Sequence, residues 1–193
     1  MENLFCFVCM LFIIKYGAVN ADCGIVSKDD WDGLTPVHVE YLNRPVQLVI
    51  IQHTDTPPCL TDNACSARVR SIQDYHMDTL KYWDIGSAFL IGGNAKVYEG
   101  SGWVHVSVPT HVYNRKALRI TFIGNYNSHQ PTTEQIDALK SLLRCGVSNG
   151  HLDSNYKIVG HRQLMATDSP GRKLYNLIRR WPEWLENVDS YKQ

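Results

Sequence analysis

The chain has 193 residues, of which 44% are hydrophobic and 20% are charged, and its 19 basic residues equal its 19 acidic residues in number. This composition excludes a disordered chain, and the length excludes a large multidomain protein. A net charge of zero leaves no basic surplus for phosphate backbones, so we expect no nucleic acid partner.

An apolar run at residues 4–14 opens the chain and is followed by Lys15 and the small residues Val19 and Ala21. The run is too short to cross a bilayer, which needs roughly 20 residues. It is typical of a secretory signal peptide over residues 1–21, although the basic residue usual at its start is missing. We therefore expect a secreted, extracellular protein with one domain over residues 22–193 and no membrane span; a retained membrane anchor is the alternative.

The first half of this domain alternates strands and helices. Residues 46–52 are mostly apolar, with an unbroken apolar run at 48–51, and rich in β-branched side chains, which predicts a strand buried on both faces. Val69, Ile72 and His76 recur at helical spacing and predict a helix over residues 65–80. Two short strands follow, at residues 87–91 and 96–98.

The second half continues the alternation. We expect a strand at residues 119–123, a helix at 132–147 that begins with the capping box Thr132 and Gln135, and a strand at 157–159. A last helix at residues 173–180 ends before a proline. These elements predict an α/β fold in which helices flank a central mixed β-sheet.

Four cysteines remain once the signal peptide is removed: Cys23, Cys59, Cys65 and Cys145. An even number in an oxidising compartment predicts disulfides, and four cysteines allow three pairings. Cys59 and Cys65 are close enough in sequence for a local bridge, which would leave Cys23 for Cys145. A cysteine zinc site is the alternative, but the mature chain lacks a close Cys-x-x-Cys pair.

Two histidines follow predicted strands directly. His53 comes after the strand at residues 46–52, and His161 comes after Ile158, Val159 and Gly160. Sheet proteins commonly build clefts at the carboxyl ends of their strands. A single histidine there is more often packed and hydrogen-bonded, but two in the same position favour a shared groove.

The motifs around these histidines resemble those of the animal peptidoglycan recognition proteins. The resemblance runs in order from about Cys23 to Trp181 and is carried by His53-Thr54, Gln73-Asp74-Tyr75-His76, Trp83-Asp84-Ile85-Gly86, Phe89-Leu90-Ile91-Gly92, Val97-Tyr98-Glu99-Gly100, Tyr113-Asn114, Phe122-Ile123-Gly124-Asn125, Gly160-His161-Arg162 and Ser169-Pro170-Gly171. It implies a fold similar to the phage amidase lysozymes, one groove for the muramyl peptide stem, and disulfides Cys59–Cys65 and Cys23–Cys145.

Catalytic members of that family are zinc amidases, and the resemblance implies His53 and His161 as two of the zinc ligands. The family's third ligand is a cysteine and its transition-state donor a tyrosine, but these positions hold Ser169 and Ser87. A neutral hydroxyl is a poor zinc ligand, and loss of one oxyanion donor costs about 100- to 1,000-fold in rate. We therefore expect no catalytic residues, no cofactor and only vestigial metal positions. A zinc amidase is the alternative.

A serine hydrolase without zinc is a third possibility, with Ser169 as nucleophile and His161 as base. It would need a carboxylate that orients the histidine, and Asp168, adjacent in sequence, is poorly placed for that role.

The resemblance also implies the groove's ligand contacts. They are His53, Thr54, His76, Lys81, Tyr82, Ser87, Asn114, His161 and Ser169. His76 also belongs to the apolar stripe of its helix, so it could be a core residue instead. The family's diaminopimelate binders carry an arginine at the position of Ser101, and a buried carboxylate without a cation is costly. We therefore favour lysine-type peptidoglycan.

Taken together, the motifs predict a secreted pattern-recognition receptor of innate immunity. The resemblance implies that it binds bacterial peptidoglycan and passes the signal to downstream immune proteins, in insects typically a serine-protease cascade.

Overall fold

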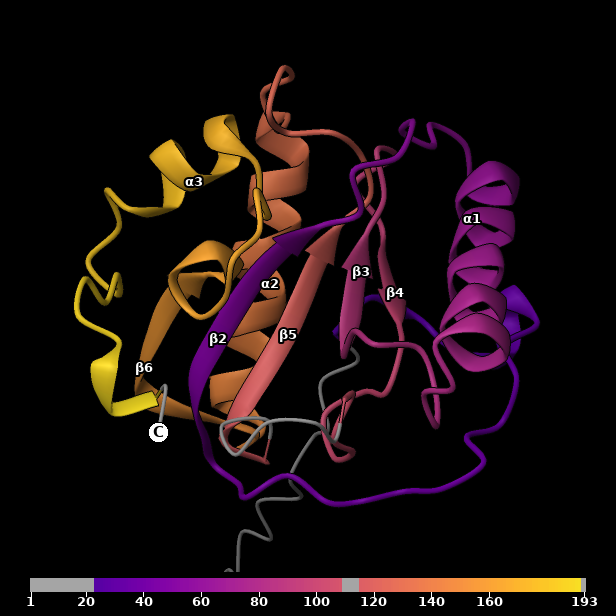
Figure 1. Ribbon diagram of the computed structural model, residues 1–193, viewed down its shortest axis with the longest axis horizontal. Helices are drawn as coiled ribbons and strands as arrows, with labels where there is room; N and C mark the ends of the chain where they lie inside the picture. The colour runs from indigo at the N-terminus through magenta and orange to yellow at the C-terminus, as the bar shows by residue number, and fades with distance from the viewer. Residues whose placement is uncertain (1–22, 109–114, 192–193) are drawn as a thin grey trace, which may run out of the picture.

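The computed structural model describes residues 23–108 and 115–191, so the predicted signal peptide and Asn114 lie outside the described residues. A mixed six-stranded sheet has the order β1-β4-β3-β5-β2-β6. Its strands are β1 (Ile25–Val26), β2 (Val46–His53), β3 (Phe89–Ile91), β4 (Val97–Glu99), β5 (Ala117–Phe122) and β6 (Leu152–Gly160). The described helices are α1 (Asp62–Asp74), α2 (Thr133–Ser148) and α3 (Arg172–Ile178), which confirms the predicted fold class (Figure 1).

Four consecutive strands of the sheet, β3, β5, β2 and β6, are parallel. β2 pairs in parallel with β5 on one side and with β6 on the other, and β3 pairs in parallel with β5. β4 runs antiparallel to β3, which makes the sheet mixed as predicted. Because β2 and β6 are parallel neighbours, their carboxyl ends lie at the same edge of the sheet.

Most element boundaries lie within two residues of the sequence expectation, and the differences at α1, β6 and β1 are the informative ones. α1 begins at Asp62 because the Thr61 hydroxyl accepts the N–H of Ala64, and its last turn, Tyr75–Thr79, is π-helical. β6 begins at Leu152, well before the predicted residue 157. The prediction missed its first half because these residues are largely polar, lie at the edge of the sheet and form no apolar pattern. β1 was not predicted, since two residues carry no periodicity.

One face of the sheet packs on α2, which lies behind the strands in Figure 1. Leu139 and Leu143 of this helix join one core cluster with Leu118, Ile120 and Phe122 of β5. The capping box is present: the Thr132 hydroxyl accepts the N–H of Gln135, whose side chain accepts the N–H of Thr132.

The opposite face of the sheet has two separate covers. Near β6, Val188 and Leu185 of the C-terminal segment pack on Leu48 and Ile50. Near β4, helix α1 packs in a second cluster with Leu90 and Tyr98. Each cover is apolar, but the side chains of Gln52, Arg119 and Thr121 on the strands between them are polar.

Both expected disulfides are present. Cys59–Cys65 ties the loop before α1 to the first turns of that helix, and Cys23–Cys145 ties the start of the described chain to α2. In the described part of the chain, no helix has the length and apolarity needed to span a membrane.

Candidate functional site

A cavity of about 700 Å³ opens on the sheet face between its two covers. Its floor comes from β2 and β5, one wall from α1 and the π-helical turn, and the other wall from the loop after β6. This volume lies within the range of about 300–1,000 Å³ that small-molecule sites occupy.

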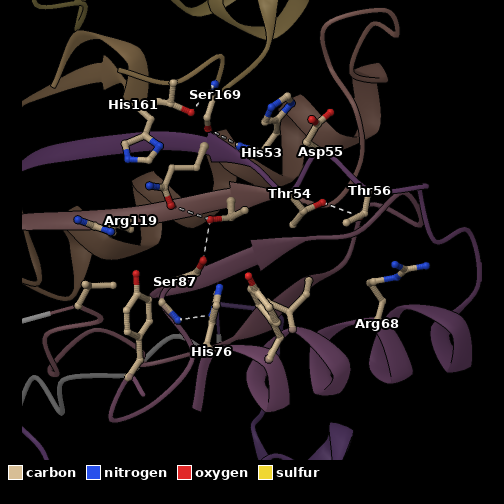
Figure 2. Close-up of a pocket in the computed structure, with 18 of the residues that line it drawn as sticks. His53, Thr54, Asp55, Thr56, Arg68, His76, Ser87, Arg119, His161 and Ser169 are labelled. Atoms are coloured by element: carbon tan, nitrogen blue, oxygen red, sulfur yellow. Dashed lines mark hydrogen bonds between the residues drawn. The ribbon is translucent and has the colours of Figure 1, made fainter. Parts of the chain in front are cut away.

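The two strand-end histidines line this pocket together, as predicted. His53 is the last residue of β2, and His161 directly follows β6. Ile51 pairs with Gly160 in the parallel register, which brings the ends of the two strands to the same place. Figure 2 shows His53, His161 and Ser169 together on one side of the pocket.

Backbone groups fix the hydrogen bonds of His53. Its Nδ1 accepts the N–H of Tyr126 at 3.2 Å, so the neutral ring carries its proton on Nε2. Burial is the main cause that lowers the pKa of His53; Arg162 adds to this effect, whereas Asp55 and Asp168 oppose it. At neutral pH this ring is therefore an uncharged N–H donor on the pocket wall.

Ser169, for which the resemblance implies the position of the zinc cysteine in catalytic members, is almost fully buried. Its Oγ accepts the backbone N–H of His53 at 3.0 Å (Figure 2). The adjacent Asp168 carboxylate makes no hydrogen bond to any residue that the structure describes. The arrangement therefore lacks the carboxylate-oriented histidine that a serine triad requires.

These residues do not fit a zinc site. Zinc is held by thiolate, imidazole or carboxylate ligands, and Ser169 offers a neutral hydroxyl instead. A metal-binding histidine normally donates its second ring N–H to an acceptor, whereas the Nδ1 of His53 faces a backbone donor. Within residues 23–108 and 115–191, no three His, Cys, Asp or Glu side chains converge on a possible metal position.

His76 lines the pocket from the π-helical turn rather than lying in the core. Its Nδ1 accepts the N–H of Gly86 at 2.9 Å, so its neutral ring also carries the proton on Nε2. Burial lowers the pKa of His76 to about 4; Asp84 opposes the shift and Arg119 adds to it. This second imidazole is therefore an uncharged donor as well.

Ser87 belongs to a hydrogen-bonded chain on the pocket floor (Figure 2). Thr121 donates its hydroxyl hydrogen to Oε1 of Gln52 at 3.2 Å, and the hydroxyls of Ser87 and Thr121 are 2.7 Å apart. Because Thr121 has one hydroxyl hydrogen, Ser87 must be the donor of that second bond. Its oxygen can offer only lone pairs to a ligand.

The other predicted contacts are placed unequally. Thr54 and Tyr82 line the pocket, and the Thr54 hydroxyl accepts the N–H of Gly124. Lys81 is exposed, has a left-handed φ of 58°, and does not line the pocket. Asn114 lies outside the described residues.

Sequence reasoning missed two arginines that line the pocket, Arg68 from α1 and Arg119 from β5. Arg119 and Thr121 alternate with Leu118, Ile120 and Phe122, a period of two that indicates one polar and one apolar strand face. This alternation was the signal that could have found Arg119, whereas no such pattern marks Arg68 on the helix α1. A preference for lysine-type peptidoglycan follows only if the groove has no cation for a second carboxylate, and Arg68 and Arg119 are two such cations. The preference itself stays a prediction.

Comparisons with known proteins agree with this geometry. A family model described as N-acetylmuramoyl-L-alanine amidase matches residues 42–173, more than half of the chain. A peptidoglycan recognition protein of Trichoplusia ni is 64% identical over 187 residues, covering 97% of this chain and 100% of the relative. The chain belongs to the peptidoglycan recognition protein family.

Solved structures of the family have the same fold. Manduca sexta peptidoglycan recognition protein-1 superimposes with a TM-score of 0.87 and 73% identity, covering 88% of this chain and 97% of that one. Peptidoglycan recognition protein-LE, solved with tracheal cytotoxin, a monomeric diaminopimelic acid-type peptidoglycan, has a TM-score of 0.82 and 33% identity over 86% of this chain and 98% of its own.

Proposed function

We propose that this protein is a secreted pattern-recognition receptor that binds peptidoglycan stem peptides in the described pocket and does not hydrolyse them. Membership of the peptidoglycan recognition family supports the ligand class. The single observation that carries the absence of hydrolysis is Ser169, a neutral hydroxyl held by the N–H of His53 where amidases need an anionic zinc ligand.

The floor of the pocket supports the same proposal. An amidase must donate hydrogen bonds to the oxyanion that forms on the scissile carbonyl. The Ser87 hydroxyl hydrogen is directed to Thr121, so Ser87 cannot act as this donor without breaking the chain to Gln52. Neutral donors at His53 and His76 instead suit the ground-state carbonyl oxygens of a bound peptide.

A zinc-dependent N-acetylmuramoyl-L-alanine amidase is the second candidate. It is favoured by the description of the matching family model and by the retention of His53 and His161 on one pocket wall. The two candidates differ in what happens to the ligand after binding, so one experiment separates them.

The test is to mix the purified protein with a muramyl pentapeptide, with and without zinc, and to follow binding by calorimetry and cleavage by mass spectrometry. We expect saturable binding and an intact ligand under both conditions. Release of free stem peptide would establish the amidase, and absence of binding would reject the receptor.

The double variant S169C/S87Y supplies the positive control, because it restores both residue types of the catalytic members. The single variant S169C should bind zinc more tightly than the wild type, since a thiolate completes a three-ligand site. Zinc titration by calorimetry measures this gain. Equal zinc affinities of S169C and the wild type would show that the hydroxyl is not what weakens metal binding.

Secretion and signalling complete the proposal. The predicted signal at residues 1–21 and the two disulfides support export, because disulfides persist in oxidising compartments. Expression in insect cells should deliver to the medium a chain that begins after Ala21, which N-terminal sequencing checks.

For signalling, addition of this protein with peptidoglycan to insect plasma depleted of its own recognition proteins should activate serine proteases. Neither component should do so alone.

A further inference from the structure

The charged residues of α1 are paired with one exception. Asp62 is 2.7 Å from the ammonium of Lys96, and Arg70 donates to the carboxylate of Asp74 at 3.0 Å. Arg68 makes no hydrogen bond or ion pair with any residue that the structure describes. Any hydrogen-bond or ion-pair partner of Arg68 must therefore be a ligand, solvent or another group outside the described residues.

The helix itself offers Arg68 no acidic partner. Residues three and four positions away on an α-helix are the ones a side chain can reach, and here they are Ala64, Cys65, Ser71 and Ile72. Ser71 and Ile72 line the pocket, as does Arg68, which is half-buried. Figure 2 shows Arg68 rising from α1 at the end of the pocket where Thr56 lies.

The pocket lining has permanent positive charges on α1 and β5. Asp55, Arg162 and Asp168 act on His53, and Asp84 and Arg119 act on His76, which is neutral at physiological pH. Arg68 from α1 and the buried Arg119 from β5 keep their charge at any physiological pH. The two lie at opposite ends of the pocket in Figure 2, so each guanidinium favours an anionic group of the ligand in its own part of the pocket.

We propose that Arg68 binds a carboxylate of the stem peptide and thereby determines which stem peptides the pocket prefers. A guanidinium suits this role because its planar fork donates two parallel hydrogen bonds to a carboxylate. The inference rests on the proposed function. Stem peptides can carry this group on a second-position D-glutamate that is not amidated, or on a third-position diaminopimelate in place of lysine.

The family's diaminopimelate binders have an arginine at the position of Ser101. A serine provides no positive charge there. Its side chain is buried outside the pocket lining and donates to the carbonyl oxygen of His105 at 3.3 Å. Arg68 thus supplies from α1 a positive charge that Ser101 cannot supply.

The test uses four muramyl tripeptides that combine D-isoglutamate or D-isoglutamine at position two with lysine or diaminopimelate at position three, each amidated at the C-terminal α-carboxyl group so that only the two varied carboxylates remain. Calorimetry gives the affinity of each for the wild type, R68Q, R68K and R144Q. Arg144 lies on α2, on the other side of the sheet, so R144Q is the matched control for the loss of one positive charge.

We expect the wild type to bind at least one carboxylate-bearing peptide about 10- to 100-fold more tightly than the matched peptide without that carboxylate. R68Q should abolish that ratio while leaving the affinity for the matched peptide unchanged, R68K should retain part of it, and R144Q should match the wild type. The pair of peptides that shows the effect identifies the carboxylate as that of glutamate or of diaminopimelate.

Two outcomes overturn the inference without affecting the proposed function: equal affinities of the wild type for all four peptides, or an equal loss for all four in R68Q. Absence of any binding to the wild type rejects the proposed function itself. Melting temperatures of the variants establish that each is folded. We expect them to be folded because Arg68 is only half-buried and its replacement breaks no hydrogen bond or ion pair with the described residues.

Discussion

Two pocket histidines share one arrangement at the level of single residues. In His53 and in His76, Nδ1 accepts a backbone N–H, from Tyr126 and Gly86 respectively. Each neutral ring therefore has its remaining N–H on Nε2, on the side that the backbone does not occupy. Such a pair donates hydrogen bonds to peptide carbonyl oxygens and gains nothing from protonation.

The low pKa of His76 predicts how stability depends on pH. Its pKa is about 4 in the folded protein, and the ordinary histidine value is 6.5. Between these pH values the unfolded chain binds the additional proton, so stability falls as the pH falls from about 6.5 to about 4. The full effect of this residue is about 3 kcal/mol, and burial of His53 acts in the same direction.

Urea unfolding of the wild type and of H76Q between pH 7 and pH 4 measures this contribution. Glutamine cannot titrate, and its side-chain oxygen can still accept the N–H of Gly86, so H76Q should lose less stability on acidification. Parallel curves for the two proteins would contradict the assignment. H105Q, which changes a histidine outside the pocket lining, is the control.

The candidate site was only partly predictable at this scale. His53 and His161 could be placed together because the ends of parallel strands meet, whatever the rest of the fold. Arg119 could have been found from the alternation in β5. Arg68 could not, because the direction in which a helical side chain points depends on how α1 packs on the sheet, which no local pattern specifies.

Secondary structure elements were predictable where they bury a continuous apolar face. β2 and β5 are buried along almost their whole length, and their apolar residues indicated them directly. The first half of β6 is largely polar, and β1 consists of two residues paired with β4. Such segments are strands only because a neighbour supplies their hydrogen bonds, so a single sequence does not reveal them.

The capping box of α2 was predicted from two residues, and its energetic role is testable. Replacing Thr132 by alanine removes the acceptor of the Gln135 N–H and should lower the free energy of unfolding by about 1 kcal/mol. Urea denaturation at pH 7 measures the difference. Thr133 is exposed and one residue further along, so T133A should change stability by less than half as much. Equal effects of the two substitutions would show that the cap contributes nothing specific.

At the scale of the whole molecule, the pocket exists because the two covers of one sheet face do not meet. α1 shields β3 and β4, the C-terminal segment shields β2 and β6, and the strip between them carries Gln52, Arg119 and Thr121. An apolar strip would require a third cover. Polar side chains there can be satisfied by hydrogen bonds, as Thr121 is by Gln52 and Ser87, which makes the absence of a cover compatible with stability.

The two disulfides should contribute unequally to the stability of this assembly. Cys23–Cys145 closes a sequence separation of 122 residues, and Cys59–Cys65 closes one of 6. If a disulfide acts mainly by restricting the unfolded chain, the long loop is worth about 5 kcal/mol and the short loop about 2 kcal/mol. Urea unfolding of the C23A/C145A and C59A/C65A double variants tests this order. The long-range variant should unfold at the lower urea concentration; the reverse order would mean that the short bridge acts in the folded state, by holding the loop before α1 at the pocket wall.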